Sequence, residues 1–304
     1  MRARPTAPVV PPVVPAPTVP GYRLLERMAH GKRLDTWDAW DELRGTRCVI
    51  KLVRPDRRAQ DRVVEALRRE GVIATTLAHP HLVRGYEVLD DPVAVVLETL
   101  RGQTLGRVVE DGALGVPDVA ELGLQLTAVL GFLHHHDWLH LDVKPGNVVV
   151  DHGRAVLIDL NLAGRPGEGR PGAGTPGYLA PEQAHGGTLT SATDVWALGV
   201  VLLECLTGEQ PFGQEATWDT RRRWPLLHRR PPGPPTPPAH LPSPLAALLL
   251  SCVDHDPAAR PRLADVRAVL EPLTGRPPGP RTGPRTGPQT GPQAGSHAPP
   301  SLPS

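Results

Sequence analysis

Cysteine is scarce in this chain of 304 residues, which contains only Cys48, Cys205 and Cys252. An odd number of scattered cysteines in apolar surroundings does not make the disulfide framework of a small secreted domain. The scarcity indicates a reducing compartment, and we expect the protein to be cytoplasmic.

An excess of charge of one sign is also missing, because Lys and Arg total 33 while Asp and Glu total 32. Without a net field, the chain has no general attraction for nucleic acid or for an anionic membrane surface. The longest apolar runs, residues 197–206 and 244–253, are well short of the roughly 20 residues that span a bilayer. We expect buried helices there, no membrane span and no nucleic-acid partner.

Proline, by contrast, is abundant, with 38 residues, many of which lie near both ends and over 229–238. Near the C-terminus a four-residue unit repeats without an apolar side chain to bury, so it cannot offset the entropy of ordering. We expect a Pro-rich disordered leader over 1–20 and a Pro/Gly-rich disordered tail over 275–304. Both are candidate docking segments for a partner.

Hydrophobic periodicity divides the rest of the chain into two parts. Short β-type runs and one helical pattern occupy about residues 21–100, and helical spacing dominates about residues 101–274. The sequence therefore predicts an α+β fold. Strands are expected at 22–28, 36–40, 47–53, 86–90 and 92–100, and helices at 57–77, 116–137, 191–208, 243–254 and 262–273.

The segment HLDVKPGN, residues 140–147, carries an acid, a lysine and an amide in fixed order. Phosphoryl transfer needs an acid to orient the attacking hydroxyl, a cation near the transferred phosphate and oxygen ligands for magnesium. Asp142, Lys144 and Asn147 are residues of these types. Asp159, twelve residues after Asn147 and beyond another strand-like run, is a second candidate metal ligand.

With this segment the sequence resembles the eukaryotic-like Ser/Thr protein kinases of bacteria, and the resemblance covers residues 21 to about 274. Further motifs of that family follow in order: CVIK ends at Lys51, GTPGYLAPE spans 174–182 and DVWALG spans 194–199. The resemblance implies a two-lobed kinase-like fold, with a small antiparallel β-rich N-lobe that carries one main helix and a larger helical C-lobe. It also implies ATP and Mg²⁺ as cofactors and a protein as substrate.

The same resemblance implies roles for single residues. The implied catalytic residues are Asp142, which orients the Ser or Thr hydroxyl and accepts its proton, and Lys144, which stabilises the transferring phosphoryl group. For the nucleotide, the resemblance implies that Lys51, oriented by Glu70, binds the α and β phosphates and that Gly31 belongs to the phosphate loop. It also implies that Glu98 and Leu100 lie at the adenine. Asn147 and Asp159 are the implied ligands of Mg²⁺. Arg260 is implied to pair with Glu182.

One departure from the family concerns its G-x-G-x-x-G phosphate loop, which here reads AHGKRLD. Ala29, Gly31 and Leu34 fall on the three glycine positions. Because glycine lets the backbone approach an anion closely, we expect Leu34 to crowd the tip of the loop and the grip on the nucleotide to be weakened. Lys32 and Arg33 are expected to compensate in part through their charge.

A second departure is DLN, residues 159–161, where the family has DFG. We expect Leu160 to fill an apolar slot, and Asn161 to replace glycine in a left-handed backbone conformation, which Asn tolerates best among the other residues.

A third departure concerns regulation. Leu141 stands where kinases switched by their activation loop have an arginine, and residues 162–174 contain no Ser, Thr or Tyr. Since these two absences agree, we hypothesise that phosphorylation of this loop does not switch the protein.

The sequence thus favours a cytoplasmic signalling kinase that phosphorylates Ser/Thr hydroxyls of proteins with a weakened nucleotide loop. The main alternative is a pseudokinase that acts as a protein-binding scaffold or regulator, which the poor glycine loop favours. A third candidate is a small-molecule phosphotransferase. A deep pocket between the lobes would favour this last class, whereas an open shelf beside Thr175 would favour a protein substrate.

Overall fold

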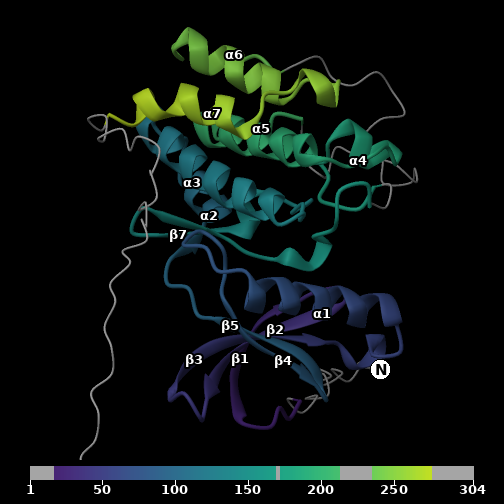
Figure 1. Cartoon of the computed structure of the whole chain (residues 1–304). Coiled ribbons are helices and arrows are strands. Elements are labelled where there is room, and N and C mark those ends of the chain that lie inside the picture. The colour runs from purple at the N-terminus through teal and green to yellow at the C-terminus, as the bar shows by residue number, and fades with distance from the viewer. Residues whose placement is uncertain (1–16, 169–171, 213–234, 276–304) are drawn as a thin grey trace, which may run out of the picture.

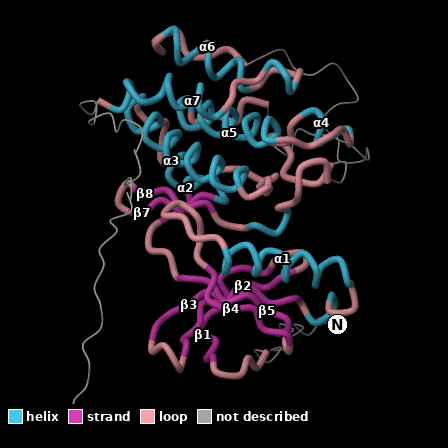
Figure 2. The backbone as a smooth tube through the Cα atoms, in the orientation of Figure 1, coloured by secondary structure: helices cyan, strands magenta, loops and turns pink. Residues whose placement is uncertain are grey.

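The computed structural model describes residues 17–168, 172–212 and 235–275, which form two lobes (Figure 1). Most of the predicted leader and tail lie outside the described residues. The first lobe is a five-stranded antiparallel sheet in the order β1-β2-β3-β5-β4, with one helix, α1, between the sheet and the second lobe (Figure 2). Its elements are β1 (Tyr22–His30), β2 (Leu34–Asp41), β3 (Thr46–Val53), α1 (Asp61–Thr76), β4 (Gly85–Asp90) and β5 (Val93–Glu98).

The alternation of residue types along β3 determines which face of the sheet each residue supplies. Cys48, Ile50 and Leu52 are buried on one face in a small cluster. Lys51 and Val53 alternate with them on the opposite face, where Val53 joins the main core together with α1. This alternation places the side chain of Lys51 on the face of the sheet that α1 covers.

Helix α1 begins at Asp61, four residues later than predicted, because Pro55–Arg57 forms a separate 3-10 turn. Its apolar face is buried against the sheet. A Cβ atom added to Gly71 would overlap the side chains of Val88 and Val95, so glycine is required for this close approach. The approach brings Glu70, the preceding residue, to the sheet.

The second lobe consists mainly of helices, as predicted, and also contains a small three-stranded sheet in the order β6-β7-β8. The sheet elements are β6 (Gln103–Thr104), β7 (Val148–Asp151) and β8 (Arg154–Leu157). The helices are α2 (Leu105–Glu110), α3 (Val116–His135), α4 (Pro181–His185), α5 (Ser191–Thr207), α6 (Ser243–Cys252) and α7 (Leu263–Leu270). The sequence analysis did not predict β6, β7, α2 and α4, which are too short to show a clear period.

Helix α3 is long and apolar enough, by length and composition, to cross a membrane, and half of its most apolar window is buried inside the fold. It contacts α5, α7 and β8. Burial against three elements of one lobe is typical of a core helix, and we interpret α3 in that way.

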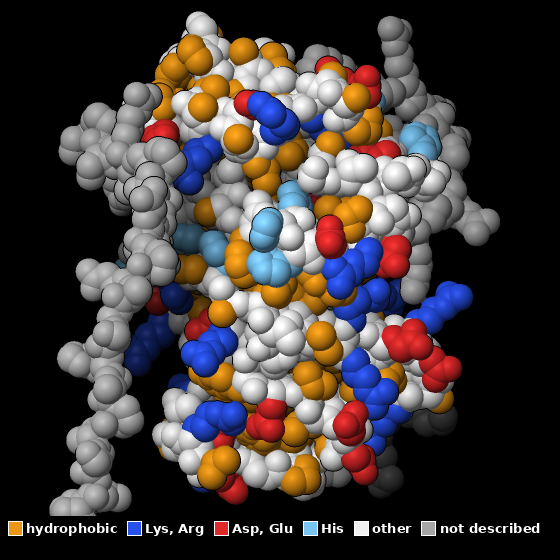
Figure 3. Space-filling model, viewed as in Figure 1, with side chains coloured by type: hydrophobic (Ala, Val, Ile, Leu, Met, Phe, Trp, Pro, Cys, Tyr) orange, Lys and Arg blue, Asp and Glu red, His pale blue; other side chains and the backbone are white. Residues whose placement is uncertain are grey.

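The surface agrees with the balanced composition. Figure 3 shows Lys and Arg side chains interspersed with Asp and Glu over the visible face of the first lobe. On that face no single sign of charge dominates.

A buried ion pair holds α4, which begins within the last two residues of the GTPGYLAPE segment. Nη1 and Nη2 of Arg260 donate to the two carboxylate oxygens of Glu182, each at 2.8 Å, and the Arg260 side chain is fully buried. Nη1 also donates to the carbonyl oxygen of Ala192, and Nε donates to that of Asp254. The pair predicted from the resemblance therefore forms, and Arg260 ties α4 to the start of α5.

We expect Arg260→Ala to lower the free energy of unfolding by about 3–5 kcal/mol, because it leaves the buried Glu182 carboxylate without its partner. Chemical denaturation with a two-state fit measures this change. Arg267→Ala, which removes an exposed arginine of α7, is the matched control and should shift the unfolding midpoint far less. Equal shifts in the two variants would contradict the structural role of the buried pair.

Candidate active site

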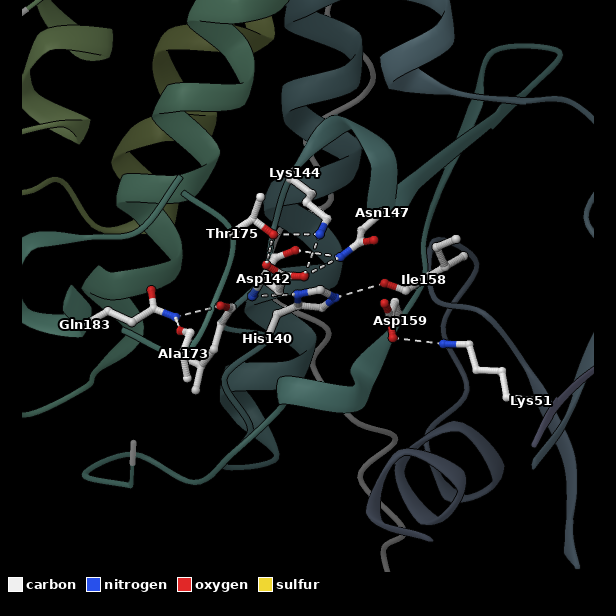
Figure 4. Close-up of polar contacts among 11 residues, drawn as sticks. Lys51, His140, Asp142, Lys144, Asn147, Ile158, Asp159, Ala173, Thr175 and Gln183 are labelled. Atoms are coloured by element: carbon white, nitrogen blue, oxygen red, sulfur yellow. Dashed lines mark hydrogen bonds and ion pairs between the residues drawn. The ribbon is translucent and has the colours of Figure 1, made fainter. Parts of the chain in front are cut away.

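The carboxylate of Asp142 is the centre of the polar network shown in Figure 4. Its Oδ1 accepts a hydrogen bond from the Thr175 hydroxyl at 2.7 Å. Its Oδ2 accepts one from Nδ2 of Asn147 at 2.9 Å and lies 3.0 Å from Nζ of Lys144. Both oxygens are thus held in place, so the direction of the carboxylate is determined by its neighbours.

Lys144 links this network to the GTPGYLAPE segment. Its Nζ donates to Oγ1 of Thr175 at 2.6 Å, while that same hydroxyl donates to Asp142. Two segments far apart in the sequence therefore meet at the Thr175 hydroxyl. The structure brings together the two predicted catalytic residues and places the candidate substrate segment beside them.

A second cluster joins the two lobes through Lys51. Its Nζ donates to Oε1 of Glu70 at 2.6 Å and to Oδ1 of Asp159 at 2.8 Å. Burial opposes the charge of Lys51, but the adjacent carboxylates of Glu70 and Asp159 outweigh burial and raise the pKa of Lys51. For Asp159, burial favours the neutral form, yet the charge and hydrogen bond of Lys51 lower its pKa. Lys51 and Asp159 are therefore both charged at neutral pH.

The backbone of the DLN segment differs from the prediction. Asp159 has the left-handed conformation, with φ 65° and ψ 75°, whereas Asn161 lies in the 3-10 turn Leu160–Leu162 and has no positive φ. The expectation for Asn161 is wrong because the turn begins one residue after Asp159 and includes Asn161. Leu160 is fully buried in the main core cluster, as expected of an apolar slot.

The backbone before Asp142 is held by Asp194, the first residue of the DVWALG motif. The Asp194 carboxylate is fully buried and accepts hydrogen bonds from the backbone N–H groups of His140 and Leu141, both at 2.9 Å. The ring of His134 supplies a third, at 2.8 Å. These bonds stabilise Leu141 in a left-handed conformation, φ 64°, which otherwise costs roughly 1–2 kcal/mol for a residue other than glycine.

Leu141 itself packs against other leucines. It belongs to a small buried cluster with Leu139 and Leu189, against which Leu162 is partly buried. The position at which kinases switched by their activation loop have an arginine is therefore an apolar contact in this chain.

Gln183 joins the catalytic loop to the segment before Thr175, and the sequence analysis missed it. Its Nε2 donates to the carbonyl oxygens of Leu141 and Ala173, both at 2.7 Å (Figure 4). Only its position just after the APE triplet could have pointed to it, because a single glutamine carries no signal of its own.

Two oxygens in the site are suited to a divalent cation. Nδ2 of Asn147 donates to Asp142, and no described residue donates to its Oδ1. At Asp159, Oδ1 is bound to Lys51, and no described group donates to Oδ2. Neutral and charged oxygens are the ligands that Mg²⁺ prefers, and Mg²⁺ often uses one or two protein ligands plus substrate phosphates. Asn147 and Asp159 therefore fit a magnesium ion.

The phosphate loop is a tight turn, Gly31–Arg33, between β1 and β2. The N–H of Gly31 donates to the carbonyl oxygen of Leu34 at 2.9 Å, and a Cβ on Gly31 would lie 2.8 Å from that oxygen. Leu34 lies in β2, paired with Val53, and packs partly buried against the main core. The expectation that Leu34 crowds the loop tip is therefore wrong, because strand pairing directs it into the lobe.

Glu98 and Leu100, the residues implied to lie at the adenine, stand apart from these clusters. The Glu98 side chain accepts a hydrogen bond from the N–H of Arg84, and the Glu98 N–H donates to the carbonyl oxygen of Arg84, both at 2.9 Å. Both groups are therefore engaged within the first lobe. Leu100 is partly buried against the main core.

A cavity of about 780 Å³ lies between α1 and the segment that follows Asp159. Its lining includes Arg33, Arg69 and Leu141 but none of Lys51, Asp142, Lys144, Asn147 and Asp159. A small molecule in this cavity would not touch the candidate catalytic groups, so the cavity gives no support to a small-molecule phosphotransferase.

Comparison with known proteins agrees with this geometry. Residues 22–269 match the family model described as a protein kinase domain. The chain is 30% identical over 204 residues to serine/threonine-protein kinase PrkC of Bacillus subtilis, covering 64% of this chain and 32% of that protein. It is 29% identical over 286 residues to PknA of Corynebacterium glutamicum, covering 86% of this chain and 58% of that protein. It is 28% identical over 280 residues to PknA of Mycobacterium tuberculosis, covering 85% of this chain and 63% of that protein. The chain thus spans about one to two thirds of the length of these relatives.

The Asp194 network predicts how stability depends on pH. Burial alone raises the pKa of Asp194, but the hydrogen bond and charge of His134, the charge of His140 and the N–H of Leu141 hold that pKa below its ordinary value of 3.8. The ionised group therefore contributes stability that is fully present above the ordinary value and is lost as the pH falls through the lowered pKa.

We expect Asp194→Asn to lower the free energy of unfolding at pH 7 by about 2–4 kcal/mol, because an amide cannot accept all three hydrogen bonds. Its stability should also fall less steeply than that of the wild type between pH 5 and pH 3. Denaturant unfolding across this range measures both effects, with Asp90→Asn, an exposed carboxylate paired with Arg68, as the control. Identical pH profiles for Asp194→Asn and the wild type would contradict the assignment.

Proposed function

The chain belongs to the protein kinase family, and on that premise we propose that it transfers the γ-phosphoryl group of ATP to Ser or Thr hydroxyls of proteins. The observation that carries the proposal is the assembled network around Asp142, in which Lys144, Asn147 and Thr175 hold the carboxylate. Catalysis of phosphoryl transfer depends mainly on positioning and electrostatics, and these groups supply both.

In the reaction, Asp142 accepts a hydrogen bond from the substrate hydroxyl and takes its proton as the oxygen attacks the γ-phosphorus and the bond from that phosphorus to the departing ADP breaks. Lys144, 3.0 Å from Asp142, offers a positive charge to the transferring phosphoryl group. Because Thr175 fixes Nζ of Lys144, this charge needs little reorganisation during the reaction.

Lys51 binds the α and β phosphates, and its contact with Glu70 directs the ammonium group toward them. Asn147 and Asp159 would hold Mg²⁺ through the oxygens that no described residue engages. When bound, the ion neutralises charge that develops on the phosphate oxygens. The backbone of Glu98 and Leu100 faces the adenine in this proposal.

Support for a polypeptide substrate comes from a cavity of about 550 Å³ beside the catalytic loop. Gly146 and Tyr178 line it together with Glu204 and Glu209, so it adjoins both the catalytic loop and the Thr175 segment. The curated relatives carry the name serine/threonine-protein kinase, which supports the same class of acceptor.

The alternative is a pseudokinase that binds a partner without catalysis. The loop with one glycine, Gly31, favours it, because fewer N–H groups approach the phosphates closely. Against it stands the intact set of charged groups. Losing one phosphate contact removes on the order of 1–3 kcal/mol of stabilisation, which slows transfer without abolishing it.

We also propose a cytoplasmic location, which the three free and buried cysteines support. A docking role for the Pro-rich termini concerns residues outside the described part of the chain and stays a prediction.

Asp142→Asn tests the proposed chemistry. With γ-labelled ATP, Mg²⁺ and a mixed protein substrate, we expect the variant to lose at least about 100-fold in label transfer, because it loses the proton acceptor. Asp111→Asn, which alters an exposed carboxylate at the end of α2, is the control and should transfer label like the wild type.

Absence of transfer by the wild type above the Asp142→Asn level, with Mg²⁺ or Mn²⁺ at high ATP, would contradict the proposal. That result would instead support the pseudokinase.

The Thr175 hydroxyl provides a second test, because it donates to Asp142 and accepts from Lys144. We expect Thr175→Val to reduce kcat by about 10- to 100-fold, since both charged hydrogen bonds are lost. Thr175→Ser keeps the hydroxyl and should stay near the wild-type rate.

Phosphatase treatment of the purified protein should leave its activity unchanged, because a phosphate on Thr175 would place negative charge against Asp142. Activity that depends on phosphorylated Thr175 would refute both this expectation and the proposed absence of a loop switch.

A further inference from the structure

The turn Gly31–Arg33 offers two backbone donors to a ligand. The N–H groups of Lys32 and Arg33 donate to no acceptor among the residues that the structure describes. Such paired, free N–H groups in a tight turn are suited to bind an anion. This loop lacks two of the three glycines of the family. The N–H groups of Lys32 and Arg33 can therefore bind an anion only if other contacts hold the turn in place.

Arg54, just past the end of β3, contacts both sides of this turn. Its Nη1 donates to the carbonyl oxygen of Gly31 at 3.0 Å, and its backbone N–H donates to the carbonyl oxygen of Arg33 at 3.1 Å. The register of β2 with β3 explains this reach, because Leu34 pairs with Val53 and so places Arg54 beside the turn.

The guanidinium of Arg54 is itself oriented. Nε donates to Oδ1 of Asp56 at 3.0 Å and Nη2 to Oδ2 at 3.4 Å, which leaves Nη1 for the turn. The Arg54 side chain is 24% exposed, while that of its acidic partner is 50% exposed. A planar guanidinium can bind a carboxylate with one edge and a carbonyl with another, whereas an ammonium group cannot hold this geometry.

A second contact steadies the base of the turn. Nδ1 of His30 lies 2.6 Å from Oδ1 of Asp35, and these two residues face each other across the paired strands β1 and β2. The side chain of Arg54 is therefore the contact that reaches the tip from outside the hairpin.

We propose that Arg54 is a positioning residue for nucleotide binding: it anchors the Gly31–Arg33 turn so that the Lys32 and Arg33 N–H groups meet the ATP phosphates. This role rests on the proposed function, because it presumes that ATP binds beneath this loop. It accounts for a loop that keeps its shape with one glycine, since a side chain outside the loop holds the turn.

Titration calorimetry with MgATP and with adenosine tests the role in the full-length protein. We expect Arg54→Ala to weaken the affinity for ATP about 5- to 10-fold, in line with the loss of one charge-assisted hydrogen bond. The affinity for adenosine should be unchanged, because adenosine has no phosphate to meet the turn.

Arg57→Ala is the matched control. Arg57 lies 3.3 Å from Asp56 and is one turn away from Arg54, and the structure records no contact of its side chain with Gly31–Arg33. The affinity of this variant for ATP should be within about twofold of that of the wild type, because no contact with the loop is lost. Arg54→Lys keeps the charge without the fork and should resemble Arg54→Ala.

Hydrogen exchange of the Gly31 N–H, which donates to Leu34, supplies a readout that needs no nucleotide. Faster exchange in Arg54→Ala than in Arg57→Ala is expected, because the turn opens more often without its anchor.

Wild-type affinity for ATP in Arg54→Ala or in Arg54→Lys would overturn the positioning role and leave the proposed function intact. Equal loss of affinity for ATP and adenosine would also overturn it, since the effect would not involve the phosphates. No ATP binding by the wild type would instead contradict the proposed function, and this inference would fall with it.

Discussion

One buried carboxylate, that of Asp194, determines the geometry on which the candidate active site depends. It accepts hydrogen bonds from two successive backbone N–H groups, at His140 and Leu141, directly before Asp142. A left-handed leucine is costly by itself, so these bonds and the leucine cluster around Leu141 together hold the loop. The loop in turn places Asp142 against Thr175, and the proposed chemistry depends on that placement.

The second constraint is electrostatic and joins the two lobes. Lys51 from β3 lies between Glu70 of α1 and Asp159 of the second lobe. Gly71 makes this possible, because its missing side chain lets α1 approach the sheet. Two carboxylates thus meet at one ammonium group, and this contact places the candidate nucleotide-binding and metal-binding residues near one another.

Much of this arrangement was predictable from the sequence, because phosphoryl transfer needs particular residue types at particular spacings. The lobes and most helices follow from hydrophobic periodicity, whereas the Lys51–Glu70 and Arg260–Glu182 pairs were implied by the resemblance to the kinase family. What failed was local backbone conformation: Asn161 is not left-handed, and Leu34 does not crowd the loop. Pairing and turn geometry decide such details. Gln183 and Arg54 escaped notice because their partners are backbone carbonyls, which leave no pattern in the sequence.

The central claim is that a metal-dependent nucleotide site persists beneath a loop with one glycine. The most direct test is the dissociation constant for ATP measured with Mg²⁺ and again with the metal chelated. The account predicts markedly tighter binding with Mg²⁺, because Asn147 and Asp159 gain the ion as a link to the phosphates. Equal affinities with and without Mg²⁺ would contradict it and indicate a fold that holds nucleotide without the means to transfer phosphate.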